Sequence, residues 1–288
     1  MENEILKKHT SFKIGGPADL FLHVKNIDSL KKIMKEINSK NIPFFIIGKG
    51  SNLLVADEGY RGVVISLESD FKNITRENEN IVCAAGTSLA KACVFSMQNE
   101  LSGLEFAWGI PGSCGGALFM NAGAYGNDIS DVILEATHIT PDGKIETFTK
   151  DKMSLSYRKS VYCESNSIIL SLKFGLLNSK KEAIKSKMYE IISKRKSKQP
   201  LDYPSAGSTF KRPGGGYYAA ALIESSGLKG TSVGGAMVST KHSGFIVNTG
   251  NATAQDVIDL IYLIKEKIYK DFKVVMECEV KTLGNIKI

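Results

Sequence analysis

The sequence has no uninterrupted apolar run of about 18 residues, which is the length that a membrane-spanning helix needs. Its first residues also lack the apolar core of a secretory signal, so we expect a cytoplasmic protein without membrane insertion. No arginine-rich tract with interleaved aromatic residues occurs, and there is no nucleic-acid fingerprint. The net charge of +7 over 288 residues permits anionic partners without requiring RNA or DNA, because a polyanionic small ligand accounts for it equally well.

Cysteine and histidine are few and scattered. The five cysteines are odd in number, contain no C-x-x-C pair and form no metal-ligand cluster with the four histidines. We therefore expect no metal site, and we expect reduced thiols packed as small apolar groups. The cysteines are Cys83, Cys93, Cys114, Cys163 and Cys278.

The composition is that of a globular protein with a sizeable core, because 43% of the residues are hydrophobic and 23% are charged. The first part of the chain is rich in strand-like runs and poor in helices, which favours an α+β fold over regular βαβ alternation. A change in composition near Leu177 predicts a domain boundary. The lysine-rich segment Leu177–Gln199 carries one apolar helical stripe, and we interpret its basic face as solvated, with a nucleic-acid patch as the alternative.

Capping residues, periodicity and turn residues predict the individual elements. Helices are expected over Ser29–Ser39 after an Asp28 cap, Ser88–Asn99, the lysine-rich segment, Tyr217–Ser226, and from a Thr253/Asp256 capping box to about Lys270. Strands are expected over Pro43–Ile47, Leu53–Ala56, Gly62–Ser66, Ile81–Ala85, a Val132–Thr140/Lys144–Thr149 hairpin, Ser167–Phe174, Ser232–Ser239, Gly244–Asn248 and Lys273–Leu283. In the last of these, Glu277 and Glu279 face the same way.

Two glycine-rich segments are the candidate ligand sites. Gly109–Gly126 reads GIPGSCGGALFMNAGAYG, and its six glycines alternate with small or apolar residues. We interpret it as a buried loop and short helix against a flat, largely apolar ligand, with a tight turn between core elements as the alternative. Gly48–Asn52 lies between two apolar runs, and its N–H groups could form an anion-binding concavity; a plain hairpin turn is the alternative.

Eight further segments, in this order, are shared with one enzyme family. They are HTSFKIGGPA (9–18), IIGKGSNLLV (46–55), GIPGSCGGALFMNAGAYG (109–126), SYRKS (156–160), PSAGSTFKRP (204–213), ALIESSGLKG (221–230), KHSGFIVN (241–248) and ECEV (277–280). On these segments the chain resembles the UDP-N-acetylenolpyruvoylglucosamine reductase (UDP-N-acetylmuramate dehydrogenase) family. The short spacing between Phe174 and PSAGS resembles the family subtype that lacks a substrate-covering loop.

The resemblance implies a two-subdomain FAD-binding fold of the vanillyl-alcohol-oxidase type and a C-terminal α+β substrate-binding domain. The FAD-binding domain would cover residues 1–177, in subdomains of about 1–67 and 68–177, and the substrate-binding domain residues 178–288, with its last strand returning toward the flavin site. Non-covalent FAD is implied at Gly48, Lys49, Gly50, Ser51, Asn52, Leu53, Ile110, Pro111, Gly112, Ser113, Gly115, Gly116, Asn121, Gly123, Ala124 and Tyr125. The turn Gly48–Leu53 would hold the pyrophosphate.

The resemblance also implies a reaction in peptidoglycan precursor synthesis. NADPH would reduce FAD, and flavin N5 would pass a hydride to the vinyl carbon of UDP-N-acetylenolpyruvoylglucosamine, giving UDP-N-acetylmuramate after protonation. Arg158 would stabilise the developing charge, Ser208 would donate the proton, and Glu279 would assist. The implied substrate-binding residues are Tyr157, Lys211, Arg212 and Lys241.

Without the resemblance, Arg158 is open to interpretation as a surface ion pair, Ser208 as a turn residue, and Glu277 and Glu279 as solvent-facing acids. Two other functions stay open: an FAD-dependent sugar or alcohol oxidase on the same scaffold, and a basic nucleotide- or nucleic-acid-binding protein. The oxidase would require covalent flavin on histidine or cysteine, for which His9 and Cys114 are the only candidates near these motifs. The sequence does not fix the oligomeric state, and we expect a monomer.

Overall fold

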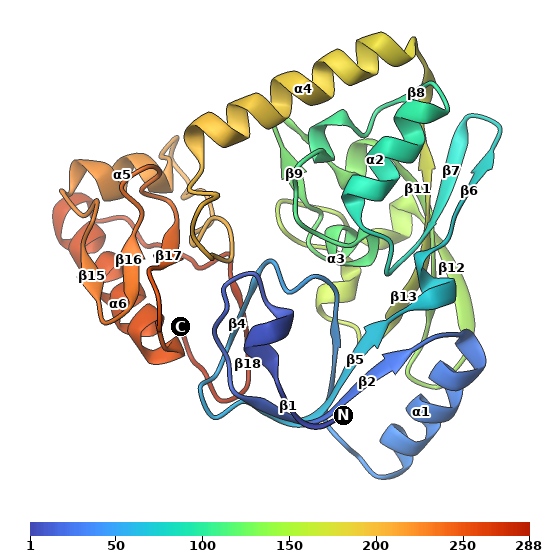
Figure 1. The fold of residues 1–288 in the computed structure, drawn as a ribbon, viewed down its shortest axis with the longest axis horizontal. Coiled ribbons are helices and arrows are strands. Elements are labelled where there is room, and N and C mark those ends of the chain that lie inside the picture. Colours follow the sequence, from blue (N-terminus) through green and yellow to red (C-terminus); the bar gives the residue numbers. More distant parts are fainter. The chain divides into compact units, whose positions relative to one another are not determined.

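A computed structural model describes all residues, 1–288, and its contacts divide the chain into two compact units (Figure 1). The first unit comprises Met1–Phe21, Gly50–Gly62 and Lys196–Ile288. The second unit comprises Leu22–Lys49 and Val63–Arg195. The chain therefore passes between the two units several times. One of these crossings lies between Lys49, in the second unit, and Gly50, in the first unit.

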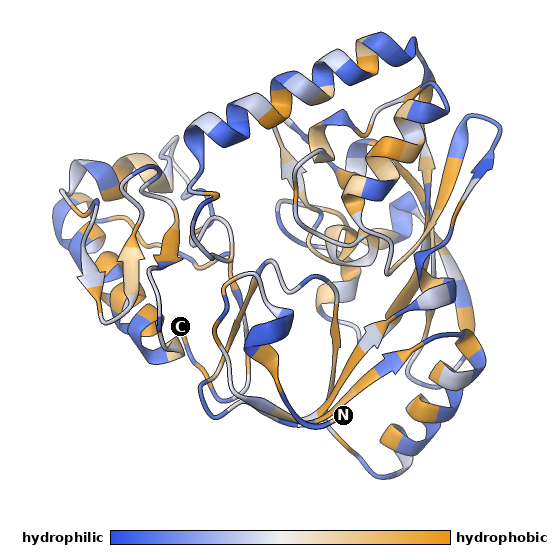
Figure 2. Ribbon diagram, viewed as in Figure 1, coloured by the Kyte–Doolittle hydropathy of each residue, from blue (hydrophilic) through white to orange (hydrophobic).

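The second unit contains a five-stranded antiparallel sheet, in the order β12-β11-β13-β7-β6. Helix α3 packs on strands β7 and β13, and α2 packs on α3, so these helices lie against one face of the sheet. Apolar residues are frequent in β13 and β7, whereas the edge strand β6 is mostly hydrophilic (Figure 2). The bounds are β6 Ile74–Glu77, β7 Asn80–Ala84, β11 Ile133–Ile139, β12 Ile145–Thr149, β13 Ile168–Gly175, α2 Leu89–Gln98 and α3 Cys114–Phe119.

Strand β3, most of β5, helix α1 and most of α4 also belong to the second unit. Strand β3 (Phe44–Ile47) pairs in parallel with β5 (Tyr60–Leu67), and α1 (Ile27–Ser39) precedes β3. Helix α4 (Lys181–Lys198) buries Ile184, Met188 and Ile191 of the predicted stripe. The smaller strands are β8 Leu101–Ser102, β9 Gly123–Ala124, β10 Asn127–Asp128 and β14 Leu177–Asn178.

The first unit is built on a three-stranded antiparallel meander, β15-β16-β17, that packs on α6. One apolar cluster joins α6 and α5 to residues from both ends of the chain, including Phe12, Leu54 and Val280. The bounds are β1 Glu2–Ile5, β2 Pro17–Val24, β4 Leu53–Val55, α5 Ala219–Ser225, β15 Ser232–Val233, β16 Ala236–Val238, β17 Ile246–Asn248, α6 Ala254–Phe272 and β18 Lys281–Leu283.

Helix capping explains where the long helices begin. The capping box at the start of α6 is confirmed, because Thr253 Oγ1 accepts from Asp256 N and Asp256 accepts from Thr253 N. The predicted cap of α1 is wrong. Asn26 is the N-cap, accepting from Ser29 N at 2.9 Å, while Asp28 lies inside the first turn, where its charge suits the helix dipole.

Two strand predictions need correction. Gly48–Asn52 is not a hairpin turn, because β3 pairs with β5 whereas β4 pairs in parallel with β18. The predicted strand Lys273–Leu283 is wrong over most of its length: Lys273 ends α6 in a left-handed conformation, and only Lys281–Leu283 form a strand. Met276 and Val280 are buried, as the alternating pattern predicts. Before Lys281, however, the segment packs on the core of the first unit without the continuous backbone hydrogen bonds of a strand.

Candidate active site

The turn between β3 and β4, Gly48–Asn52, is fixed on its first-unit side by backbone contacts that require glycine. Gly50 has a φ of 57°, and a methyl group on its Cα would lie 2.2 Å from the carbonyl oxygen of His9. Ser11 N donates to Gly50 O at 3.1 Å, and Ser11 Oγ donates to Ser205 O at 2.7 Å. The backbone of His9–Ser11 therefore packs directly against Gly50.

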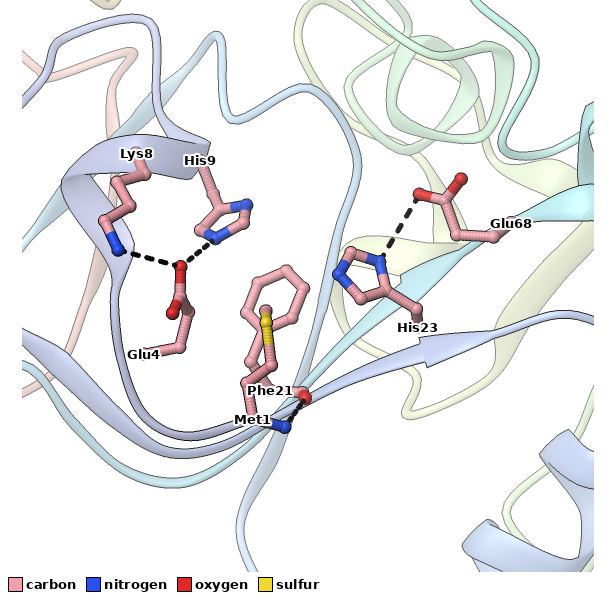
Figure 3. Close-up of polar contacts among 7 residues, drawn as sticks. All are labelled: Met1, Glu4, Lys8, His9, Phe21, His23 and Glu68. Atoms are coloured by element: carbon pink, nitrogen blue, oxygen red, sulfur yellow. Dashed lines mark hydrogen bonds and ion pairs between the residues drawn. The ribbon is translucent and has the colours of Figure 1, made fainter.

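His9 is itself held by neighbours in the first unit. Its Nε2 lies 3.0 Å from Glu4 Oε1, and its ring stacks on Phe21 with 4.2 Å between centroids (Figure 3). The amino group of Met1 donates to Phe21 O at 2.9 Å. The bond from His9 lowers the pKa of Glu4, so the carboxylate stays charged. The sequence suggested His9 only as an attachment point in the oxidase alternative and suggested no role for Ser11, although both lie in a quoted family segment.

Asn52 joins the same turn to the C-terminal segment. Its Nδ2 donates to Glu279 O at 3.1 Å, and its carbonyl oxygen accepts from Lys281 N at 3.0 Å. The contacts that hold the turn thus use the carbonyl oxygens of Gly50 and Asn52 and one amide side chain. Its backbone N–H groups, the donors that suit a phosphate, are not among them, so the turn fits the pyrophosphate of a dinucleotide.

In the second unit, the start of α3 lies against the beginning of that turn. A methyl group on Gly48 would be 2.5 Å from Ser113 Oγ, which caps α3 by accepting from Gly116 N at 3.2 Å. The N–H groups of Cys114 and Gly115 donate to Thr87 O and Ala85 O, at 2.8 and 2.9 Å. Because the protein occupies these N–H groups, the start of α3 is not a second anion site.

The glycines around α3 instead leave a bare surface. Gly116 is exposed on a helix that is otherwise largely buried, and Gly112, just before the helix, is half-buried. The nearest atom to a methyl group on Gly112 would be 3.6 Å away, and Gly116 has only Ser113 Oγ within 4 Å. A surface without side chains fits a planar ring lying on backbone, as expected for the flavin part of FAD. Ile110 is half-buried and Pro111 is exposed beside it.

Residues 123–128 form a tight hairpin in which β9 pairs with β10. Tyr125 and Gly126 occupy its turn with φ values of 55° and 92°, the left-handed pair that a type I′ turn needs. The hydroxyl of Tyr125 reaches the carbonyl oxygen of Ile191 in α4 at 3.4 Å. Gly123 and Ala124 make up β9. The glycine-rich stretch is thus a short helix followed by a hairpin.

Arg158 lies in a four-residue turn, Ser156–Lys159, that the glycine-rich hairpin contacts directly. Its φ is 57°, an uncommon value for a residue with a side chain. Its Nη2 donates to Gly123 O at 3.3 Å, and its guanidinium lies over the ring of Tyr157, 4.9 Å from the centroid. The structure therefore brings three of the predicted site residues together, Arg158, Tyr157 and Gly123.

Ser208 and Glu279 come from adjacent segments of the first unit. Glu279 N donates to Thr209 O at 2.8 Å, and Phe210 and Cys278 form an isolated bridge between the same segments. Ser208 is exposed, whereas Thr209 is buried and its Oγ1 accepts from Ile246 N at 3.1 Å. The buried Thr209 anchors the segment and leaves the hydroxyl of Ser208 at the surface.

The two acids that spacing could not separate have different surroundings. Glu277 is 71% exposed and its Oε2 pairs with Lys211 Nζ at 3.0 Å. Glu279 is half-buried; its backbone N–H donates to Thr209 O, and its carbonyl oxygen accepts from the side-chain amide of Asn52. The backbone of the second acid is therefore hydrogen-bonded to the turn Gly48–Asn52.

The remaining candidate cations have partners within the first unit. The guanidinium of Arg212 lies over the ring of Tyr218, 4.6 Å from its centroid. Lys241 Nζ donates to Lys196 O at 2.7 Å. Stacking on Tyr218 fixes the plane of the guanidinium. Nothing in the residue pattern indicated the stacking by Tyr218.

The cysteines do not form part of these polar clusters. All five are free thiols, and burial with neighbouring thiols raises the pKa of Cys93 and Cys114. Cys114 therefore stays a neutral thiol at neutral pH, which does not suit attachment of a flavin. No group of three or more histidine, cysteine, aspartate or glutamate side chains is placed to hold a metal ion.

Comparison with known proteins supplies the class first. A family model described as FAD binding domain matches residues 18–149, which contain the turn at Gly48 and the glycine-rich stretch. A second model, described as UDP-N-acetylenolpyruvoylglucosamine reductase, C-terminal domain, matches residues 199–283. The molecule is thus a flavoprotein with a second, C-terminal domain, and the predicted α+β fold class is confirmed.

Whole-chain relatives supply the family. The chain is 47% identical to the UDP-N-acetylenolpyruvoylglucosamine reductase of Syntrophomonas wolfei, over 98% of this chain and 94% of that protein, and 47% identical to that of Clostridium novyi, over 98% and 91%. Its fold is similar to the crystal structure of UDP-N-acetylenolpyruvylglucosamine reductase from Thermus caldophilus, with a TM-score of 0.85, 34% identity and 98% of both chains covered. The chain belongs to the UDP-N-acetylenolpyruvoylglucosamine reductase family.

None of the helices is both long enough and apolar enough to cross a lipid bilayer.

Proposed function

We propose that this protein is an NADPH-dependent flavoenzyme that reduces UDP-N-acetylenolpyruvoylglucosamine to UDP-N-acetylmuramate in peptidoglycan precursor synthesis. The observation that carries this proposal is the match to reductases of that name over nearly the whole of both chains. Family membership also argues against the two alternatives, an FAD-dependent oxidase and a nucleic-acid-binding protein.

FAD is held without a covalent bond, mainly by residues 1–177, while residues 178–288 bind the substrate. The turn Gly48–Leu53 receives the pyrophosphate on its N–H groups, supported by the contacts of Gly50 and Asn52. The backbone around Gly112 and Gly116 would hold the flavin ring. When bound there, FAD would supply the redox chemistry, which is hydride transfer between NADPH and the vinyl carbon of the enolpyruvyl group.

Arg158 stabilises the negative charge that develops toward the substrate carboxylate. A guanidinium suits this task because its planar fork matches a carboxylate and stays charged at any working pH. The left-handed backbone of Arg158, the bond to Gly123 O and the ring of Tyr157 hold the group in one direction before substrate arrives. Such preorganised charge lowers the barrier more than a mobile cation can.

Ser208 donates the proton to the carbon next to the carboxylate, and Glu279 assists. The exposed hydroxyl of Ser208 stands beside the segment of Glu279, because Thr209 O accepts from Glu279 N. Glu277 is the less suitable acid, since its carboxylate is exposed and paired with Lys211. A serine is weakly acidic, so it depends on neighbouring charge to donate a proton in the transition state.

Tyr157, Lys211, Arg212 and Lys241 bind the rest of the substrate, with the three cations directed to its diphosphate. The absence of extra sequence between Phe174 and Pro204, beyond the strand and helix already described, supports the subtype without a substrate-covering loop. We further propose that it works in the cytoplasm as a monomer.

A visible spectrum of the purified protein tests this function. We expect a yellow preparation with flavin absorbance that bleaches with NADPH and recovers when UDP-N-acetylenolpyruvoylglucosamine is added under nitrogen. A colourless preparation that FAD does not turn yellow would contradict the proposal. Recovery of colour by simple sugars or alcohols with oxygen consumption, but not by the enolpyruvyl substrate, would point to an oxidase instead.

A further inference from the structure

The side chain of Asn121 connects the glycine-rich stretch to the turn that carries Arg158. Asn121 is 2% exposed and has a left-handed backbone, with a φ of 41°. Its Nδ2 donates to Ser156 O at 3.0 Å and to Asp128 Oδ2 at 3.1 Å, and its Oδ1 accepts from Ser130 N at 2.9 Å. The protein therefore uses both amide hydrogens and the amide oxygen of this side chain.

The first of these bonds reaches the base of the arginine turn. The carbonyl oxygen of Ser156 also accepts from Lys159 N at 3.1 Å, and Ser156 N donates to Lys159 O at 3.0 Å, which closes the turn. Arg158 lies inside it with a left-handed backbone that residues with a side chain disfavour. Such a conformation persists only where the surroundings hold it, and the bond from Asn121 is one such support.

A second bond ties the other end of the turn to the same place. Ser160 is fully buried, and its Oγ donates to Phe119 O at 2.8 Å, at the last residue of α3. Asn121 follows two residues later, so both tethers start from the end of α3. With the turn fixed at both ends, Arg158 Nη2 meets Gly123 O.

We propose that Asn121 is a positioning residue for Arg158, acting through the carbonyl oxygen of Ser156, in addition to any backbone contact with the cofactor. Its amide links the glycine-rich stretch to the turn Ser156–Lys159, and this link helps to hold the guanidinium of Arg158 in one direction. The inference rests on the proposed function, because it assumes that Arg158 stabilises charge on the substrate.

Two substitutions separate the amide from the backbone. Asn121→Gly keeps the left-handed conformation without strain but removes the side chain. Asn121→Asp keeps the shape but replaces the amide donor by a carboxylate oxygen facing the carbonyl of Ser156. The matched control is Asn78→Gly, which makes the same change at an exposed residue with a φ of 57°.

Stopped-flow measurements then follow the two half-reactions separately. Both Asn121 variants should keep bound FAD, because any contact of Asn121 with the cofactor uses its backbone, and reoxidation by UDP-N-acetylenolpyruvoylglucosamine should slow by roughly 100-fold, the usual cost of a misplaced group. Reduction by NADPH should change far less than reoxidation. In calorimetry, affinity of the oxidised enzyme for UDP-N-acetylmuramate should fall by roughly tenfold, as for one lost charge-assisted hydrogen bond. Asn78→Gly should change neither value.

A double-mutant cycle decides between positioning and general structural support. In an Arg158→Ala background, Asn121→Gly should have no further effect on reoxidation, because its only route to the substrate is already gone. Additive losses would overturn the inference, and so would loss of FAD from a folded Asn121→Gly protein. If Asn121→Gly fails to fold, Ser160→Ala and Asn121→Asp carry the same cycle. A wild-type protein that the enolpyruvyl substrate does not reoxidise would refute the proposed function itself, whereas normal reoxidation of a folded Asn121→Gly protein would refute only this inference.

Discussion

Replacing Gly50 by alanine places a methyl group where the structure has no room. The added Cβ would lie 2.2 Å from His9 O and 2.9 Å from the Cα of Thr10, and both are backbone atoms that cannot rotate away. The φ of 57° alone costs a residue with a Cβ about 1–2 kcal/mol. Forcing the two backbones apart adds about 1–3 kcal/mol, so we expect a total destabilisation of about 2–5 kcal/mol.

The control is Gly143→Ala, in the tip of the hairpin between β11 and β12. Gly143 has a φ of 86° but nothing within 4 Å of a methyl group, so only the conformational cost applies there. Urea denaturation of the two apoproteins should therefore show a clearly larger loss for Gly50→Ala. Titration of flavin fluorescence should show weakened FAD affinity for Gly50→Ala alone. Equal losses of stability in the two variants, with unchanged FAD affinity, would refute the argument that His9 fixes the turn.

Three further predictions concern the chemistry and the core. Arg158→Ala and Ser208→Ala should keep FAD and its reduction by NADPH, but slow flavin reoxidation by the substrate by about 10²–10³ in stopped flow, as for the loss of one charge-stabilising group; undiminished reoxidation would remove either residue from the mechanism. Glu279→Gln should slow the same step while Glu277→Gln leaves it within about twofold, since exposed ion pairs contribute little; the reverse order would exchange their roles. Burial lowers the pKa of His138 below the ordinary value of 6.5, so its contribution to stability is present above about pH 6.5 and is lost as the pH falls through the unfolded-state value toward the folded one. Urea denaturation at pH 7.5 and pH 5.5 should show this loss in the wild type and a smaller one in His138→Gln.

Local signals predicted most of the regular structure. The hairpin around Gly143, the capping box of α6 and the apolar stripe of α4 all follow from nearest-neighbour chemistry, and the structure confirms them. The cap of α1 was misassigned because Asn26 and Asp28 are both good capping residues, and only the backbone conformation selects one. The last predicted strand failed for a different reason: its alternation reflects burial against the first unit's core, and burial alone does not require a partner strand.

The candidate site, too, was predictable from sequence only in part. The density of glycine in the sequence located the turn at Gly50 and the stretch around α3. Several of these positions have close neighbours that leave no room for a side chain, and clusters of glycine indicate such positions. The roles of Arg158, Ser208 and Glu279 came from resemblance and stay predictions. The difference between Glu277 and Glu279 could not be seen from spacing, since it depends on contacts with residues distant in sequence. The support that Asn121 gives to Arg158 is of the same kind.

The bond between Asn52 and Glu279 spans 227 residues of sequence, and the strand that follows it, Lys281–Leu283, pairs with Leu53–Val55. During synthesis, the turn Gly48–Asn52 and the strand after it can therefore form these contacts only after almost the entire chain has left the ribosome. If this turn holds FAD as proposed, a nascent chain that ends before residue 279 would carry every glycine of the cofactor region and still lack these contacts. Capture of the flavin would then be a late event in maturation that depends on completion of the polypeptide.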